Sequence, residues 1–299
     1  MTRGIVILGP PRSGTTLLRR ILGAHPDIAA PPETYLLSGA ARFLHEDRFS
    51  PGLPIGAVAG LGFAGFDEAE VLSRLRAFVF GFADDFARRH DKRRWALKTA
   101  FDAFHVPAIR RLCAGHVQFV CLQRQGLDVI ASLEELVHKT GGYVDELHAY
   151  VRRHPDPLEA FAQAWIDAAG AVAELAADEP GAIALRYEDL VREPAAVIAD
   201  LLARLGARAD EGVLARALAE LGEVGFGDWK TYGRATIDDS SVDRWRRLPA
   251  AARARLAELC NPTLVRLGYG AVPIDTATDD AQRRYELGLM VQRMRRPTS

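Results

Sequence analysis

The 299-residue sequence predicts an α/β protein of three layers, in which a central parallel sheet is flanked by helices and followed by a helical C-terminal part. Two observations carry this prediction. Short apolar runs alternate with longer segments of helical periodicity, which is typical of parallel strands joined by crossover helices. The apolar runs also lack a regular polar alternation, as expected for strands that are covered on both faces.

The expected elements follow in chain order. Apolar or β-branched runs predict strands at residues 4–8, 95–98, 117–122 and 182–186. Recurrence of apolar residues at steps of three and four predicts helices at 15–24, 67–89, 104–113, 127–138, 157–177 and 194–205. After residue 206 only helical patterns remain, at 211–221, 249–267 and 279–294. The strands therefore belong to the first two thirds of the chain.

The chain shows no Pro- or Ser-rich linker and no internal repeat. We therefore expect a single domain over residues 1–299, with a helical extension at about 271–299 that packs either on its own domain or on a partner subunit in a homodimer. Segment 50–66 alternates five glycines with apolar residues. Such a long loop indicates either an apolar lid over a substrate or an irregular surface excursion, and the pattern leaves both readings open.

Charge and cysteine content narrow the classes of partner. The 38 basic and 39 acidic side chains give a net charge of -1, which argues against nucleic acid as the main partner. The three cysteines have no metal-ligand or redox spacing, which fits a reducing compartment. No apolar run is long enough for a membrane span, and the first is too short for a signal peptide. These features predict a cytoplasmic protein without a membrane span.

A glycine-bounded loop directly follows the first predicted strand and precedes a helix. Its sequence is Gly9-Pro10-Pro11-Arg12-Ser13-Gly14-Thr15-Thr16. Strand, loop and helix N-terminus form the setting of a phosphate-binding loop, whose backbone N–H groups converge on an anion. Thr15 stands where nucleotide kinases require lysine, and the positive charge lies in the loop as Arg12. The fold class is therefore P-loop-type, with a generic strand-turn-helix as the alternative.

These residues carry a family resemblance. Pro11-Arg12-Ser13-Gly14-Thr15-Thr16-Leu17 resembles the 5′-phosphosulfate loop of sulfotransferases that use 3′-phosphoadenosine 5′-phosphosulfate (PAPS). With Ala24-His25-Pro26-Asp27 and Glu33-Thr34, the stretch is similar to the tyrosylprotein sulfotransferase branch and its bacterial relatives. The resemblance runs from Ile5 to about Tyr269. It implies PAPS as co-substrate, adenosine 3′,5′-bisphosphate (PAP) as product, and no metal.

The resemblance implies three catalytic residues. Glu33 matches the family's catalytic base, which takes the proton of the acceptor hydroxyl. Lys98 matches a strand-end lysine that stabilises the sulfonate and the bridging oxygen, and Arg12 supports the leaving phosphate. From the residues alone, Glu33 could equally be a solvated loop residue or a helix cap, and Lys98 a strand-end lysine in water.

The resemblance also implies which residues bind the cofactor. They are Arg12, Ser13, Gly14, Thr15 and Thr16 of the loop, Arg124 and Ser132 at the 3′-phosphate, Tyr187 at the adenine, and Arg244 before Trp245. Gln125-Gly126 departs from the family's usual residues after the arginine without changing either 3′-phosphate position. Segment 229–241 is expected to contribute as well. The alternatives are a surface role for Arg124 and a core role for Tyr187.

The sequence thus predicts an enzyme, a sulfotransferase that moves the sulfuryl group of PAPS to a hydroxyl or amine. The acceptor is a small molecule or a peptide. The apolar segment 53–66 and the aromatic residues at 78, 80, 82 and 86 point to an apolar or aromatic one, with a core role for the helical aromatics as the alternative. Two alternatives from other classes are a P-loop kinase or other phosphotransferase and a non-catalytic PAP- or PAPS-binding protein. The lysine missing at position 15 and the Arg124/Ser132 pair argue against the kinase.

Overall fold

The computed structural model describes residues 4–48, 54–142, 145–219, 236–274 and 287. Backbone contacts divide the chain into two compact units. The first unit comprises Met1–Arg124 and Ala168–Asp239, and the second Gln125–Asp167 and Ser240–Ser299. Each unit is described by itself below, and the expectation of one domain over residues 1–299 stays a prediction.

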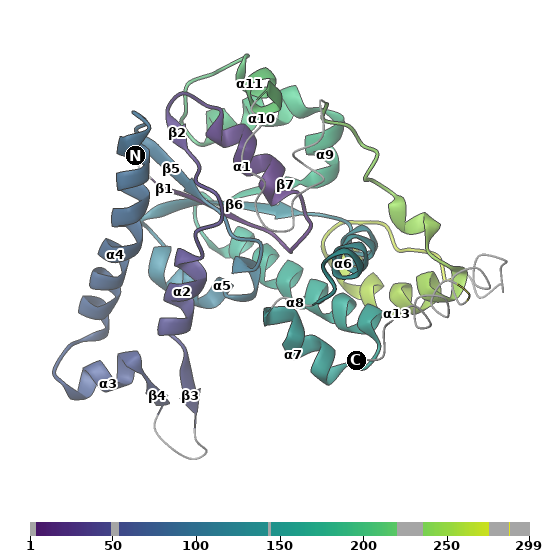
Figure 1. The fold of residues 1–299 in the computed structure, drawn as a ribbon, viewed down its shortest axis with the longest axis horizontal. Helices are drawn as coiled ribbons and strands as arrows, with labels where there is room; N and C mark the ends of the chain where they lie inside the picture. Colours follow the sequence, from purple (N-terminus) through teal and green to yellow (C-terminus); the bar gives the residue numbers. More distant parts are fainter. Residues whose placement is uncertain (1–3, 49–53, 143–144, 220–235, 275–286, 288–299) are drawn as a thin grey trace. The chain divides into compact units, whose positions relative to one another are not determined.

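A five-stranded parallel sheet forms the centre of the first unit, in the order β2-β5-β1-β6-β7 (Figure 1). The strands are β1 (Gly4–Leu8), β2 (Ile28–Ala29), β5 (Arg94–Leu97), β6 (Val117–Gln123) and β7 (Ile183–Arg186). All four predicted strands are present within one or two residues of the expected bounds. The sequence pattern missed β2, because two residues are too few to show periodicity.

Helices cover both faces of this sheet, so the predicted three-layer α/β architecture is confirmed. One face packs on α1 (Thr15–Gly23), α9 (Tyr187–Arg192), α10 (Pro194–Arg204) and α11 (Val213–Ala219). The other packs on α4 (Glu68–Arg89), α5 (Val106–Cys113) and the end of α8 (Pro157–Asp178). Successive residues of β1 alternate between the two cores: Ile5 and Ile7 belong to the first, Val6 and Leu8 to the second. All four are fully buried.

Between β2 and α4 lie short elements that the sequence did not predict. They are α2 (Leu36–Phe43), an antiparallel hairpin of β3 (Glu46–Arg48) and β4 (Pro54–Gly56), and α3 (Ala57–Phe63). A single turn of 3-10 helix, η1 (Asp102–Phe104), follows β5. The described part of segment 50–66 is therefore ordered as strand and helix rather than as an irregular excursion, while its role as a lid stays a prediction.

The second unit is helical. It contains α6 (Gly126–Thr140), α7 (Asp145–Arg153), the first half of α8, η2 (Arg244–Arg247) and α13 (Ala250–Arg266). The predicted helices 127–138 and 249–267 are thus confirmed. The predicted helix 279–294 lies outside the described residues apart from residue 287, as does most of segment 229–241.

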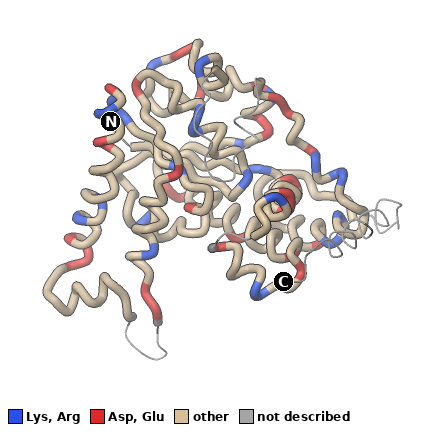
Figure 2. Tube along the Cα trace, in the orientation of Figure 1, with Lys and Arg blue, Asp and Glu red and all other residues tan. Residues whose placement is uncertain are grey.

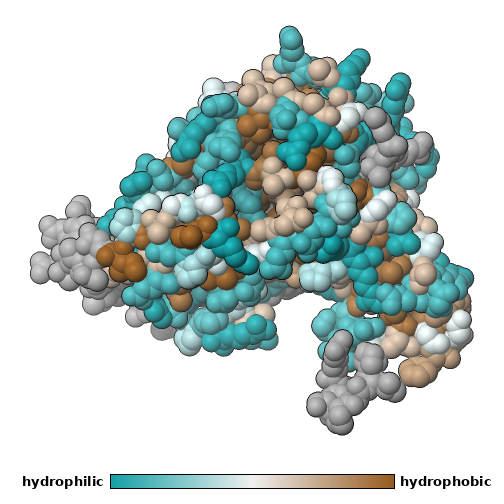
Figure 3. Space-filling model, turned by 180° about the vertical axis from the view of Figure 1, so that it is seen from behind, coloured by the Kyte–Doolittle hydropathy of each residue, from teal (hydrophilic) through white to brown (hydrophobic). Residues whose placement is uncertain are grey.

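Surface chemistry agrees with the balanced composition. Basic and acidic residues are interspersed along the described trace (Figure 2). On the face drawn in Figure 3, hydrophobic side chains reach the surface in small groups among hydrophilic ones. The described helices include none that is both long and apolar enough to cross a membrane.

Candidate active site

The glycine-bounded loop lies at the carboxyl end of β1, the central strand. Because β5 and β6 flank β1 on opposite sides, the chain reverses its direction of winding here, which is where open α/β sheets bind ligands. Gly9 is required by close packing, since a Cβ there would lie 2.6 Å from the carbonyl oxygen of Leu122. Arg12 and Gly14 adopt left-handed φ angles of 69° and 88°, which turn the chain into α1.

The interior of the loop offers donors to an anion. Ser13 is fully buried, and its Oγ has no hydrogen-bond partner among the described residues. A buried hydroxyl without a partner costs free energy, so it marks a place where a ligand atom would be accommodated favourably. Gly14 gives α1 no side-chain cap, which leaves the N–H groups of the first helical turn for the same ligand. These observations fit a phosphate or phosphosulfate group.

Lys98 connects the loop to the predicted catalytic base. It directly follows β5, and its Nζ donates to Thr16 Oγ1 at 2.6 Å. The same Nζ forms an ion pair with Glu33 Oε1. The Lys98 side chain is only 2% exposed and that of Glu33 is 18% exposed. The structure thus brings together three residues that are far apart in sequence, and the alternative of a strand-end lysine in water is wrong.

The backbone around Glu33 positions its carboxylate. The next residue but one, Tyr35, has a left-handed φ of 56° at the start of α2. Its hydroxyl lies 3.4 Å from Glu33 Oε2, so it donates to the oxygen that Lys98 leaves free. The sequence analysis missed Tyr35, because a strained tyrosine backbone has no signature in the sequence.

Arg124 and Tyr187 both contact the backbone of the glycine-bounded loop. Arg124 follows β6, is 5% exposed, and donates from Nη1 to the carbonyl oxygen of Arg12 at 2.7 Å. Its guanidinium lies 4.2 Å from the centre of the Tyr187 ring. That ring is 7% exposed and packs so closely on Gly14 that a Cβ there would lie 2.4 Å away. Both side chains therefore fix the loop, whether or not they also bind the nucleotide.

The remaining two predicted cofactor residues belong to the second unit. Ser132 lies in α6 and is 7% exposed. Arg244 begins η2 and pairs with Glu135 of α6 at 3.0 Å. Asp128, which the sequence analysis did not single out, accepts from the backbone N–H groups of Asp243 and Trp245, each at 2.9 Å. This carboxylate holds η2 on the first turn of α6.

A buried carboxyl group lies next to the candidate base, and the sequence analysis missed it. Asp102 of η1 is fully buried and accepts from Ser38 of α2 at 2.5 Å. The pKa of Asp102 is raised to about 6, mainly because the carboxyl group is buried; the hydrogen bond from Ser38 opposes this rise, and the negative charge of Glu33 adds a smaller upward contribution. The bond joins the turn after Lys98 to the helix after Glu33.

We expect Asp102→Asn to stabilise the protein at alkaline pH. The folded-state pKa lies above the ordinary value of an aspartate, about 3.9, so the folded protein holds this proton more tightly and loses stability as the pH rises from about 4 to about 6. Asparagine cannot ionise. Urea unfolding at pH 8 should show a gain of up to about 3 kcal/mol, which shrinks towards pH 4. Asp200→Asn, on an exposed aspartate, is the control, and a pH-independent difference would contradict the assignment.

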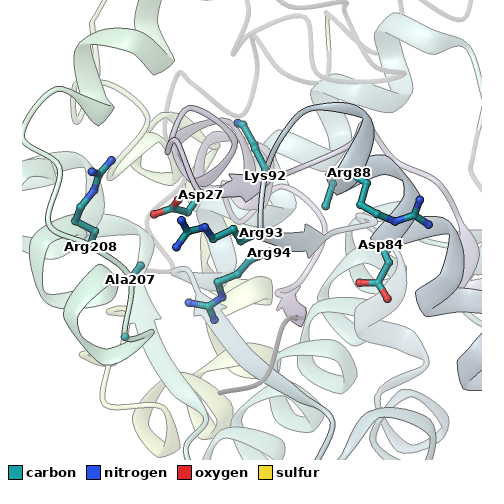
Figure 4. A pocket seen from close by; sticks show the side chains of 10 residues that line it. Asp27, Asp84, Arg88, Lys92, Arg93, Arg94, Ala207 and Arg208 are labelled. Carbon is teal, nitrogen blue, oxygen red and sulfur yellow. The ribbon is translucent and has the colours of Figure 1, made fainter.

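A cavity of about 590 Å³ lies near the start of β5, at the end of the sheet opposite to the phosphate loop (Figure 4). Two of its basic residues, Lys92 and Arg94, form hydrogen bonds within the protein. Lys92 donates to the carbonyl oxygen of Ile28 at 3.0 Å, and Arg94 donates to Leu205 O and Gln118 Oε1 at 2.8 Å each. These cations hold chain segments together, and the cavity is separate from the phosphate loop.

A phosphate loop at the carboxyl end of the central strand of a three-layer parallel domain defines the P-loop class of α/β proteins. Within that class, residues 4–211 match the model described as the sulfotransferase family. The match spans more than half of the chain, and the protein therefore belongs to the sulfotransferase family. The predicted family is confirmed. Among the described residues, no group of histidine, cysteine or acidic side chains could hold a metal ion.

The chain is also similar to individual proteins. Nodulation protein NoeE of Sinorhizobium fredii is 28% identical over 281 residues, which cover 88% of this chain but 65% of that protein. The sulfotransferase domain of the curacin biosynthetic pathway superposes with a TM-score of 0.59 at 20% identity, covering 91% of this chain and 99% of that one. The sulfotransferase domain of the Synechococcus PCC 7002 olefin synthase gives 0.58 at 23%, covering 89% and 94%. The two structures share the fold of this chain.

Proposed function

We propose that the protein transfers the sulfuryl group of PAPS to an acceptor hydroxyl or amine and releases PAP. The contact series from Thr16 through Lys98 to Glu33 is the observation that carries this proposal. It connects a loop suited to a phosphosulfate with a carboxylate suited to deprotonating an acceptor. The buried ammonium group of Lys98 contacts both the loop and the carboxylate.

Each residue has a chemical task in this reaction. The acceptor oxygen forms a bond to sulfur while the bond between sulfur and the bridging phosphate oxygen breaks, and Glu33 takes the acceptor proton. Negative charge then accumulates on the departing phosphate. Lys98, Arg12 and the N–H groups of the loop stabilise that charge in a site with little water. Positioning of the two reactants in line supplies much of the remaining acceleration.

The loop residues Ser13, Gly14, Thr15 and Thr16 are proposed to bind the 5′-phosphosulfate. We assign the 3′-phosphate to Arg124 and Ser132, the adenine to Tyr187, and a further phosphate contact to Arg244. The burial of Arg124 and Tyr187 gives them a second task, because both also support the loop from which the 5′-phosphate is bound. The proposed acceptor is a small molecule or a peptide; a cytoplasmic location and a homodimer stay predictions.

Thermal unfolding with candidate nucleotides tests the donor. A ligand at 100 times its dissociation constant stabilises the folded state by about 2.7 kcal/mol, so PAP should raise the melting temperature. Arg12→Ala is the comparison variant, and PAP should raise its melting temperature less than that of wild type. Its melting temperature without ligand should change little, since Arg12 is only half-buried. Stabilisation by ATP with Mg²⁺ but not by PAP would instead indicate a P-loop phosphotransferase.

A further inference from the structure

A pocket of about 330 Å³ lies in the first unit, beside the segment that carries Glu33. Its walls are mostly apolar. Phe82, Ala83 and Phe86 of α4 form one side, and Leu36 and Leu97 form the other. This volume falls at the lower end of the range for small-molecule sites, and an apolar lining with few polar groups is their usual composition.

Neighbouring residues of one short segment divide between the pocket and the Glu33–Lys98 ion pair. Pro31, Thr34 and Leu36 line the pocket, whereas Glu33 between them forms its ion pair with Lys98. The strand β5 shows the same division. Leu97 belongs to the core beneath α4, while the next residue, Lys98, contacts Thr16 of α1. The wall of the pocket and the candidate base are therefore neighbours along the chain at two places, residues 33–34 and residues 97–98.

Two phenylalanine side chains of α4, at or next to the pocket, are more than half exposed. Phe82 is 55% exposed, and it makes an edge-to-face contact with Phe78, 59% exposed, at a centroid distance of 5.2 Å. Exposed aromatic rings that border a pocket are a recurrent feature of sites for apolar ligands. The polar atoms at the pocket are few: the Thr34 hydroxyl, Asp85 and Arg89. Of these, Asp85 already pairs with Arg88.

On the basis of the proposed function, we propose that this pocket binds the apolar part of the acceptor, an aromatic ring or a short alkyl chain, while the acceptor hydroxyl reaches Glu33. Because the lining is apolar, the affinity for an acceptor should depend on the apolar surface area that the acceptor buries in the pocket. Each added methylene that enters the pocket should lower KM about fourfold, until the pocket is filled. Polyols should be poor acceptors, since their hydroxyl groups would lose water without gaining partners.

The test compares acceptors and variants. The acceptors are 2-naphthol, the linear alkanols from butanol to octanol, and glycerol. Phe82→Ala removes one wall at a half-exposed position, so the fold should tolerate it, and KM for 2-naphthol should rise about tenfold. The affinity for PAP should stay unchanged. Phe43→Ala, at a 40% exposed phenylalanine of α2 that lies outside segment 50–66 and does not line the pocket, is the matched control and should leave KM unchanged.

The outcomes separate this inference from the proposed function. If PAP binds and transfer occurs, but KM is the same in Phe82→Ala and Phe43→Ala or does not change along the alkanol series, the pocket assignment is overturned and the function stands. If wild type neither binds PAP nor forms sulfated product, the function fails. Calorimetry of 2-naphthol with the nucleotide-free protein then decides the pocket: equal affinity in wild type and Phe82→Ala excludes the pocket as the binding site, and binding without turnover excludes an acceptor role.

Discussion

Replacing Glu33 with glutamine should reduce turnover by about 10²–10⁴-fold, the range that removal of a general base produces. Glutamine keeps the length of the side chain, and its carbonyl oxygen can still accept from Lys98. The amide cannot take the acceptor proton, however. PAP formation from PAPS with 2-naphthol measures the loss, and the PAP dissociation constant, measured by calorimetry, should change little because Glu33 lies outside the phosphate loop.

Glu70→Gln is a suitable control for this experiment. Glu70 also forms an ion pair with a basic residue, Arg74, but lies on the exposed face of α4. Its substitution should leave turnover unchanged. Unimpaired turnover in Glu33→Gln would remove Glu33 from the mechanism. A wild-type protein that binds PAP but forms no product with any acceptor would instead favour a binding protein.

The fold was predictable because its signals are local. The apolar run of β1 is buried on both faces, which the absence of polar alternation reports directly. The loop after it carries glycines at the two places where the structure leaves no room for a side chain, Gly9 and Gly14. Elements without such local signals were missed. The strand β2 is two residues long, and α2 begins after Tyr35, a residue in a left-handed conformation.

The site was predictable to the extent that a family pattern marks it. Glu33 and Lys98 were each placed by resemblance, but nothing in the sequence indicates that their side chains meet, since 65 residues separate them. The partners that position them were not predictable. Asp102 reaches Ser38 across 64 residues, and Asp128 reaches Asp243 across 115. Such pairs depend on tertiary packing, which periodicity and spacing do not encode.

Replacing Lys98 with methionine should lower kcat by about 10²–10³-fold, the effect of removing one preorganised donor from a site of developing charge. Methionine preserves the volume of the buried stem but removes the ammonium group that both Thr16 and Glu33 contact. The leaving phosphate then loses a cation, and the Glu33 carboxylate loses its ion-pair partner. Single-turnover measurements with saturating PAPS and 2-naphthol report the chemical step. Lys98→Arg, which keeps the charge, should recover part of the rate.

The double variant Glu33→Gln/Lys98→Met tests whether the two residues act as a unit. Because one ammonium contacts both the loop and the base, each single substitution already disables the same arrangement. The combined loss in kcat should therefore be well below the product of the two single losses, as it is for groups that act together. If the losses multiply, Lys98 acts on the phosphate independently of Glu33, and the series of contacts from Thr16 to Glu33 is a structural feature without a joint role in the transfer.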